Sequence, residues 1–365
     1  MKTLEEIVNL GLENRASDIH VVCGTSVKYR IDGQLKNLDE DVFSYEDCEN
    51  LGKSILGNQY ENIKNRGEID LAVTVSNVRI RLNIFRSKGA LSFSLRILSN
   101  RIPELAKLNL PPVINDFPTY QKGIVLVTGE TGSGKSTTLA AILNEINHTR
   151  RNHIITLEDP IEYVYTPDLS LINQREVGKD TDSYANGLRA ILREDPDVIL
   201  IGEMRDSETI ETALTAAETG HLVFATLHTN SAVDSVDRIV GTFDAAKQPQ
   251  IRLQLSTTLK AVLSQQLLVR KGGVGRIAAC EIMIVTPAIR NQIREGNTAQ
   301  MQSSLLSGAN VGSITMDNCL IKMVKEGSID NVTAIEAANN QEYVRQNVGG
   351  GPAFRSTSFD TRSKL

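Results

Sequence analysis

Hydrophobic and polar residues alternate along much of the first hundred positions, as they do in strands with one buried face. Four segments show this alternation and predict strands: residues 27–31, 69–75, 78–86 and 91–98. The last two can pair across a turn at Lys88 and Gly89. Residues 4–12 carry apolar side chains at helical spacing instead. This part of the chain is expected to be a small α+β domain.

A second pattern begins after a proline-rich stretch at residues 99–118, which is expected to break regular structure. Beyond it, short apolar segments alternate with longer helical patterns, and these apolar segments are residues 123–128, 154–157, 198–201 and 222–226. That order predicts a mostly parallel sheet covered by helices. The chain after Gln250 is expected to be largely helical.

These changes of pattern predict an α/β fold class and an order of domains. We expect an α+β domain over residues 1–100, a linker over 101–118, and an α/β domain with a helical C-terminal part over 119–348. Residues 349–365 open with three glycines and are polar, so they are expected to form a disordered tail.

Composition narrows the classes of function. Hydrophobic residues make up 41% of the 365 positions, enough for a sizeable core. No apolar run approaches the ~20 residues that span a bilayer, so no direct membrane insertion is expected. The formal charge of -5 argues against a general nucleic-acid binder, which is usually basic. The four cysteines form no C-x-x-C pair, and scattered free cysteines fit a reducing cytosol.

The strongest chemical signal is at residues 129–136, which match G-x-x-x-x-G-K-[ST] between an apolar strand and a helical pattern. Gly132 and Gly134 let backbone N–H groups turn toward phosphate oxygens, and the helix N-terminus adds partial positive charge. Lys135 is expected to reach the β- and γ-phosphates of ATP, and the Ser136 hydroxyl to coordinate Mg²⁺. The residues expected to bind the nucleotide are Gly129, Thr131, Gly132, Ser133, Gly134, Lys135, Ser136 and Thr137.

Two acidic segments follow predicted strands and supply candidate catalytic groups. Glu203 lies just past the apolar segment 198–201, at the strand end where ligands bind in open α/β sheets. Its carboxylate can polarise the attacking water or hold Mg²⁺ through water, and the alternative is an ion pair with Arg205 that closes a loop. Glu158 and Glu162 also suit Mg²⁺ or water positioning, although alone they would predict a solvated acidic turn.

His221 and His228 stand at the two ends of one apolar strand, about 23 Å apart at ~3.3 Å per residue, so they cannot share one phosphate. His228, at the carboxyl end, is the better candidate for a γ-phosphate sensor. His221 is expected to serve an interface or a structural hydrogen bond. A lone histidine is more often structural, so spacing alone leaves the role of His228 open.

A short helix is predicted over residues 287–295, between a capping Thr and a terminating Gly. Ile289 and Ile293 share one face, which should pack on the core. Arg290 and Arg294 share another face, which is expected to be exposed. An ordinary amphipathic surface helix is the simpler interpretation of this spacing.

Taken in order, the P-loop, the acidic segment at 158–162, the segment that ends in Glu203 and the histidine strand resemble the secretion and pilus ATPase superfamily. The resemblance covers roughly residues 1–345 and includes the motifs called the Walker A, Asp, Walker B and His boxes. The chain is most similar to the retraction ATPases of the PilT type. It begins almost directly with residues 16–20, lacks the tetracysteine insert of the assembly ATPases, and carries residues 288–295, which resemble the retraction signature.

The resemblance implies a PAS-like N-terminal domain and a RecA-like ATPase domain in a homohexamer that hydrolyses ATP to drive pilus retraction and twitching motility. It implies that Arg81 and Arg96 act as arginine fingers toward a neighbour's nucleotide. Arg79 and Arg86 are rival candidates, and a solvated strand face is the alternative for all four. It also implies a cytoplasmic protein at the inner face of the cell membrane, bound to an inner-membrane pilus platform protein, without a nucleic-acid partner.

The nearest alternative is a pilus-assembly or type II secretion ATPase, against which the short N-terminal region argues. A RecA-type nucleic-acid motor would show a basic loop or an aromatic stacking stripe, and the sequence has neither clearly. A binding protein with a degenerate P-loop is disfavoured because Lys135, Ser136 and Glu203 are intact. A GTPase is disfavoured because the chain has no Asn-Lys pair.

Overall fold

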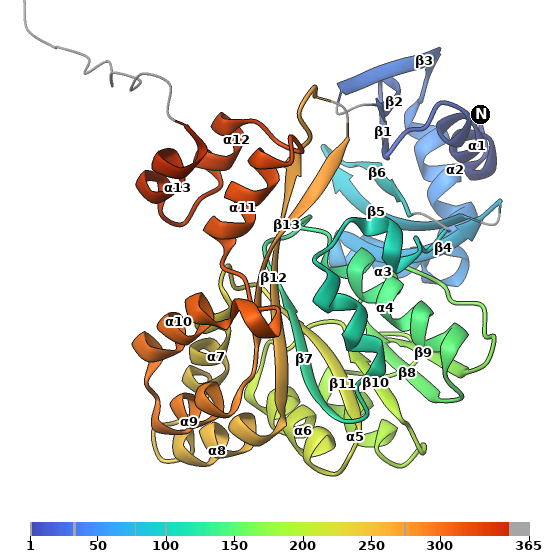
Figure 1. Cartoon of the computed structure of the whole chain (residues 1–365). Helices are drawn as coiled ribbons and strands as arrows, with labels where there is room; N and C mark the ends of the chain where they lie inside the picture. Colours follow the sequence, from blue (N-terminus) through green and yellow to red (C-terminus); the bar gives the residue numbers. More distant parts are fainter. Residues whose placement is uncertain (1, 32–33, 77, 99–100, 274, 350–365) are drawn as a thin grey trace, which may run out of the picture. The chain divides into compact units, whose positions relative to one another are not determined.

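The structure is a computed structural model that describes residues 2–31, 34–76, 78–98, 101–273 and 275–349 (Figure 1). Two compact units divide the chain, one formed by Met1–Pro103 with Asn147–Ala190 and the other by Glu104–Ile146 with Ile191–Leu365. The domain boundaries expected from the sequence stay a prediction, and the expected tail lies outside the described residues from position 350 on. Among the described residues, no helix is both long enough and apolar enough to cross a membrane.

The first unit is built around a six-stranded antiparallel sheet in the order β3-β2-β1-β6-β5-β4. Strands β8 and β9 of the same unit pair in parallel. The elements of this unit are α1 (Leu4–Glu13), β1 (Asp18–Val22), β2 (Ser26–Ile31), β3 (Gln34–Val42), α2 (Tyr45–Leu56), the 3₁₀ helix η1 (Gly57–Gln59), α3 (Tyr60–Arg66), β4 (Glu68–Val75), β5 (Val78–Ser87), β6 (Ala90–Ile97), β8 (His153–Glu158), β9 (Leu171–Glu176) and α5 (Tyr184–Ile191), whose last residue belongs to the second unit.

Alternation along β5 shows why this sheet has one buried face. Ile80, Leu82 and Ile84 are fully buried, while the residues between them are exposed or half-buried. The strand turns at positions 88 and 89 and pairs with β6 from Ser87 opposite Ala90, as the pattern predicted. The predicted helix over residues 4–12 is also confirmed as α1.

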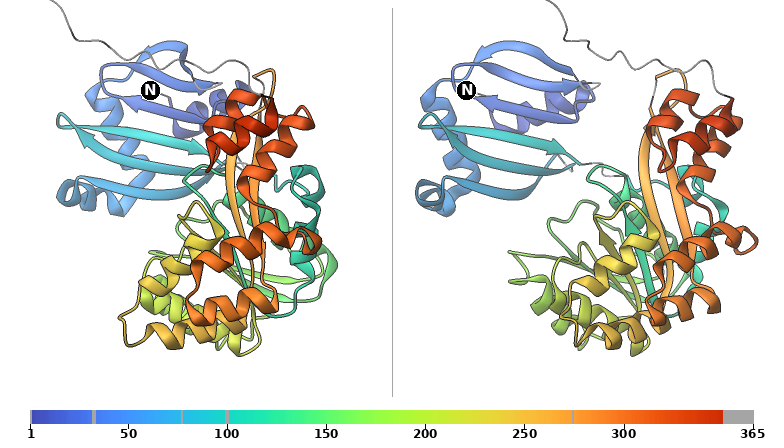
Figure 2. Two further views of the ribbon diagram at one scale, coloured as in Figure 1. Left: turned by 60° about the vertical axis from the view of Figure 1, so that its left-hand side comes forward. Right: turned by 90° about the vertical axis from the view of Figure 1, so that its left-hand side faces the viewer.

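The second unit carries a sheet in which five strands follow the order β13-β12-β7-β11-β10. Figure 2 shows β12 and β13 as two long strands, with α11–α13 beside one end and α8–α10 beside the other. The elements are η2 (Leu105–Leu108), η3 (Pro112–Thr119), β7 (Gly123–Thr128), α4 (Lys135–Thr149, whose last residues belong to the first unit), β10 (Val198–Ile201), α6 (Ser207–Glu218), β11 (Leu222–Leu227), α7 (Ala232–Gly241), α8 (Gln248–Thr258), β12 (Leu259–Val269), β13 (Arg276–Ile284), α9 (Pro287–Glu295), α10 (Thr298–Ser307), η4 (Gly308–Val311), α11 (Met316–Lys325), α12 (Asn331–Glu336) and α13 (Gln341–Val348).

Strands β7, β11 and β10 are buried at every position and pair in parallel. A parallel strand that is covered on both faces reads as a continuous apolar run, which is the pattern that the sequence showed. The predicted mixed α/β fold class is confirmed. Because the three strands run in the same direction, their carboxyl ends meet at one edge of the sheet.

The prediction that the chain is largely helical after Gln250 is wrong for β12 and β13. Strand β12 pairs in parallel with β7 and antiparallel with β13. Most of its residues are buried, so its apolar run has neither the period of a helix nor that of a half-buried strand. Periodicity alone cannot separate such a run from a buried helix.

Helix α9 has the expected ends. The Thr286 hydroxyl accepts a hydrogen bond from the N–H of Ile289, and Gly296 ends the helix in the left-handed region. Ile293 is buried and Arg294 is exposed, as predicted. The expected exposure of Arg290 is wrong, because this side chain is half-buried and its Nε atom is covered.

Candidate active site

The P-loop connects β7 to α4, and its shape depends on a contact with β12. A Cβ atom at Gly129 would lie 2.3 Å from the carbonyl oxygen of Gln265, and one at Gly134 would lie 2.9 Å from the Gln265 Nε2 atom. Both glycines also have positive φ angles, 138° and 93°. Only glycine permits this backbone path at such a short distance from β12.

Gln265 holds the loop from the side. Its Nε2 atom donates to the carbonyl oxygen of Ser133 at 3.1 Å, and its Oε1 atom accepts from the Thr138 hydroxyl at 3.0 Å. Gln265 is 2% exposed, so both hydrogen bonds are shielded from water. The loop and the first turn of α4 are therefore fixed to a neighbouring strand.

Lys135 is buried, and its Nζ atom donates to the carbonyl oxygens of Gly129 and Glu130 at 2.7 and 2.9 Å. Its ammonium group thus lies within the curve of the loop. Ser136 and Thr137 follow at the start of α4 and are half-buried, whereas Thr131 is exposed. The motif residues predicted from the sequence are therefore together on one loop and one helix start.

Glu203 follows β10, and His228 follows β11, the strand between β10 and β7. The His228 Nε2 atom lies 3.3 Å from Glu203 Oε1, and Arg205 Nη2 lies 2.6 Å from Glu203 Oε2. Burial alone would raise the pKa of Glu203, but the hydrogen bond from Arg205 and the charge of His228 outweigh it, so the pKa lies below its usual value. The ion pair with Arg205 that the sequence left open as an alternative is present, and so is a second contact with the predicted sensor.

His221 has a structural contact. Its Nδ1 atom lies 2.8 Å from the carbonyl oxygen of Ala216 and 3.1 Å from the Thr219 hydroxyl. These groups belong to the end of α6, so His221 closes the helix. The structure therefore assigns His221 a structural hydrogen bond, one of the two roles expected from the sequence.

Glu158 and Glu162 belong to the first unit. The Thr156 hydroxyl donates to Glu158 Oε1, and Gln174 Nε2 donates to the same oxygen at 3.3 Å. Burial raises the pKa of Glu158 to about 7, although these hydrogen bonds and one from the Glu162 backbone oppose the increase. A carboxyl group with this pKa can bind or release a proton near neutral pH.

The four candidate arginines differ in their contacts within the first unit. Arg81 and Arg96 stand directly opposite each other on β5 and β6, and both are exposed. Arg96 donates to Asp18 at 2.9 Å, whereas Arg81 makes no ion pair with a described residue. Arg79 pairs with Glu176 at 2.9 Å, and Arg86 pairs with Glu49 at 3.2 Å.

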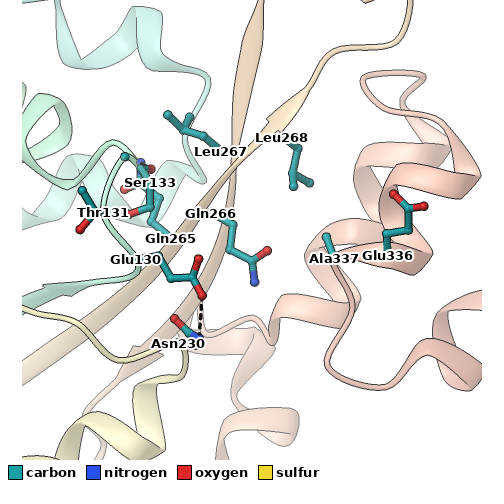
Figure 3. A pocket seen from close by; sticks show the side chains of 11 residues that line it. Glu130, Thr131, Ser133, Asn230, Gln265, Gln266, Leu267, Leu268, Glu336 and Ala337 are labelled. Atoms are coloured by element: carbon teal, nitrogen blue, oxygen red, sulfur yellow. Dashed lines mark hydrogen bonds between the residues drawn. The ribbon is translucent and has the colours of Figure 1, made fainter.

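A pocket of about 340 Å³ lies between the P-loop and the C-terminal end of α12 (Figure 3). Asn230 points toward Glu130 and donates to its Oε1 atom at 3.3 Å. Gln266 lies between these residues and the α12 end (Figure 3). The full lining is Glu130, Thr131, Gly132, Ser133, Asn230, Gln265, Gln266, Leu267, Leu268, Glu336 and Ala337.

The loop fits a phosphate group. A β-carbon at Gly129 or Gly134 would clash with β12, so glycine at both positions keeps the curve of the loop in front of α4, where a helix N-terminus favours an anion. The Ser133 hydroxyl is buried and has no hydrogen-bond partner among the described residues. Among the described residues, no three His, Cys, Asp or Glu side chains gather as a metal site.

Comparison with known proteins agrees with this arrangement. The family described as "Type II/IV secretion system protein" matches residues 1–333. The "Type IV pilus retractation ATPase PilT" of Pseudomonas aeruginosa is 42% identical over 341 residues, which cover 93% of this chain and 99% of that protein. The "Twitching motility protein" of Neisseria gonorrhoeae is 45% identical over 315 residues, with 86% and 84% covered. The chain belongs to the PilT family of type II/IV secretion ATPases.

The fold of this PilT-family ATPase is similar to a solved structure described as the pilus retraction motor PilT with bound ADP. The TM-score is 0.88 at 44% identity, and the match covers 95% of this chain and all of the other. The family therefore accounts for the mixed α/β fold and for a nucleotide site at the P-loop.

Sequence reasoning missed Gln265 in this PilT-family site. The signal was three consecutive polar residues, Ser264, Gln265 and Gln266, inside a largely apolar run. The first of them contacts the P-loop strand, since the Ser264 hydroxyl lies 2.7 Å from that of Thr128. A polar residue in a buried strand requires a partner, but the sequence does not say which one.

Proposed function

We propose that this chain is the subunit of a motor that hydrolyses ATP to drive type IV pilus retraction, and hence twitching motility. The observation that carries the proposal is the contact of Glu203 with His228 at the carboxyl ends of β10 and β11, in the same sheet as the P-loop strand β7. The similarity to PilT proteins supports the mechanical output, because it extends over almost the whole of this chain.

In this proposal the P-loop binds the triphosphate of ATP. Backbone N–H groups of the P-loop and of the first turn of α4 donate to phosphate oxygens, and Lys135 supplies the compensating positive charge. Ser136 holds Mg²⁺, which neutralises charge on the phosphate oxygens when it is bound. The Ser133 hydroxyl, buried without a described partner, is available as a further donor.

Glu203 orients the attacking water. Its pKa is lowered further below neutral pH, so Glu203 is ionised, can accept a hydrogen bond from water and is a weak base. Glu158 and Glu162 are proposed as water-positioning groups. His228 senses the γ-phosphate, because loss of that group changes the charge near its imidazole.

The motor is proposed to be a ring-shaped homohexamer in which Arg81 and Arg96 reach the nucleotide of a neighbouring subunit. Both side chains are exposed, which supports this assignment, whereas Arg79 and Arg86 are half-buried and paired with Glu176 and Glu49. Arg96 would have to leave its own ion pair with Asp18 to reach a nucleotide. The ring would work in the cytoplasm against an inner-membrane platform protein of the pilus. The PAS-like domain at 1–100 and the ATPase domain at 119–348 are part of the same proposal.

The Glu203→Gln variant tests the chemical role. The substitution removes a charge but little volume, so nucleotide binding should persist while turnover falls by about 10²-fold, as when a reacting group loses its orientation. Glu208→Gln, an exposed carboxylate in the first turn of α6, is the matched control. ATP hydrolysis by Glu203→Gln at the wild-type rate would disprove the catalytic assignment.

Deleting the gene tests the biological role. Retraction predicts excess surface pili and no twitching. Loss of pili would support an assembly ATPase instead, and unchanged pili with normal twitching would exclude both.

A further inference from the structure

Glu281, on β13, is a carboxylate with no exposed surface. It forms no ion pair with a described residue. An isolated buried carboxylate is costly, so its hydrogen bonds must supply most of its stabilisation. The groups that donate hydrogen bonds to this carboxylate therefore indicate its role.

The two carboxylate oxygens accept from the first residues of two helices. Oε1 accepts from the N–H of Ala232, where α7 begins, at 2.7 Å, and Oε2 accepts from the N–H of Met316, where α11 begins, at 3.2 Å. The capping hydroxyls of Ser231 and Thr315 serve N–H groups further along each helix. One carboxylate thus completes two helix starts that lie 84 residues apart, the difference between positions 232 and 316.

The start of α7 is directly connected to the candidate active site. His228, which contacts Glu203, is four residues before Ala232. Between them, the Thr229 hydroxyl lies 2.7 Å from the Ser235 hydroxyl inside α7. Asn230 donates to Glu130 of the P-loop at 3.3 Å, so this short segment is held between the P-loop and the start of α7.

The start of α11 is connected to the pocket beside the P-loop. Asp317 accepts from the backbone N–H groups of Asn339 and Asn340 at 2.8 and 3.1 Å. These residues follow Glu336 and Ala337, which line that pocket. The Glu281 side chain is therefore bonded both to α7, which follows His228, and to α11, which contacts the pocket-lining segment.

We propose that Glu281 is a positioning residue that holds His228 against Glu203 through α7 and makes this position depend on α11. The inference rests on the proposed role of His228 in ATP turnover. Burial raises the pKa of Glu281, and the hydrogen bonds from the two N–H groups oppose the increase.

Glu281→Gln tests the proposal, because the amide keeps the volume but replaces one acceptor with a donor. One of the two helix starts then loses its partner. We expect kcat for ATP to fall by about tenfold to a hundredfold, as for a displaced catalytic group, with KM and nucleotide affinity nearly unchanged. Asp330→Asn, an exposed cap of α12, is the control and should change neither constant.

A double-mutant cycle with His228→Ala separates positioning from general destabilisation. If Glu281 acts through His228, then adding Glu281→Gln to His228→Ala lowers kcat little further. Additive losses, or a normal kcat in Glu281→Gln beside an impaired His228→Ala, overturn the inference alone. Normal turnover of His228→Ala itself overturns the proposed sensor and the inference with it.

Should Glu281→Gln fail to bind nucleotide, Asp317→Ala tests the same connection from the half-buried start of α11. We expect kcat to fall while KM holds. An unchanged kcat in this variant overturns the proposal.

Discussion

Replacing Gln265 with alanine should loosen the P-loop without touching any motif residue. The change removes the hydrogen bond to the Ser133 carbonyl at 3.1 Å and the one from the Thr138 hydroxyl at 3.0 Å. The two partners belong to the loop and to the first turn of α4. Both would then be buried without a partner unless water enters.

The magnitude follows from these contacts. Each of the two buried groups left without its partner costs ~1–3 kcal/mol, so the free energy of unfolding should fall by about 2–6 kcal/mol. For a domain of this size, about 2–4 °C per kcal/mol lowers the unfolding midpoint by roughly 4–24 °C. In the variant, nucleotide binding must also reorder the loosened loop. A reordering cost of about 1.4 kcal/mol would raise the Kd for ADP about tenfold.

Thermal unfolding without nucleotide and titration with ADP measure both effects. Gln266→Ala is a matched control, since Gln266 is the next residue on β12 and is only half-buried. Equal unfolding midpoints and equal Kd values for Gln265→Ala and Gln266→Ala would show that the contact with Gln265 does not support the loop.

Three further predictions concern the ring, the output and pH. Mixing Arg81→Ala with Lys135→Ala chains should partly restore ATPase activity, because some interfaces then carry both groups; no recovery at any ratio would count against Arg81 as a trans finger. Replacing Arg290 and Arg294 with alanine should leave ATP turnover near normal but abolish twitching, with pili accumulating on the cell; normal twitching would leave α9 a purely structural helix. Because burial raises the pKa of Glu158 to about 7, the folded state keeps a proton that the unfolded state loses above its pKa near 4.5. Its contribution to stability should therefore fall as pH rises from about 4.5 to 7, and denaturant unfolding of Glu158→Gln should show a flatter profile over this range. An unchanged profile would contradict the raised pKa.

Local patterns predicted what local physics decides. The P-loop follows from glycines and a lysine at fixed spacing between an apolar run and a helix. The ends of α9 follow from a capping Thr and a terminal Gly, and the apolar strands β7, β10 and β11 read directly from the chain. In each case the residues that determine the structure are neighbours in sequence.

Tertiary structure decided the contacts between distant segments. Strand β12 could not be separated from a buried helix, because burial on both faces removes the period that distinguishes them. Its register beside β7 then brings Gln265 to Thr138, 127 residues away, and packing brings Glu281 to the starts of α7 and α11. No local pattern encodes these partners. A buried polar side chain announces that it needs one, but only the packing of strands and helices determines which backbone group lies within hydrogen-bond distance.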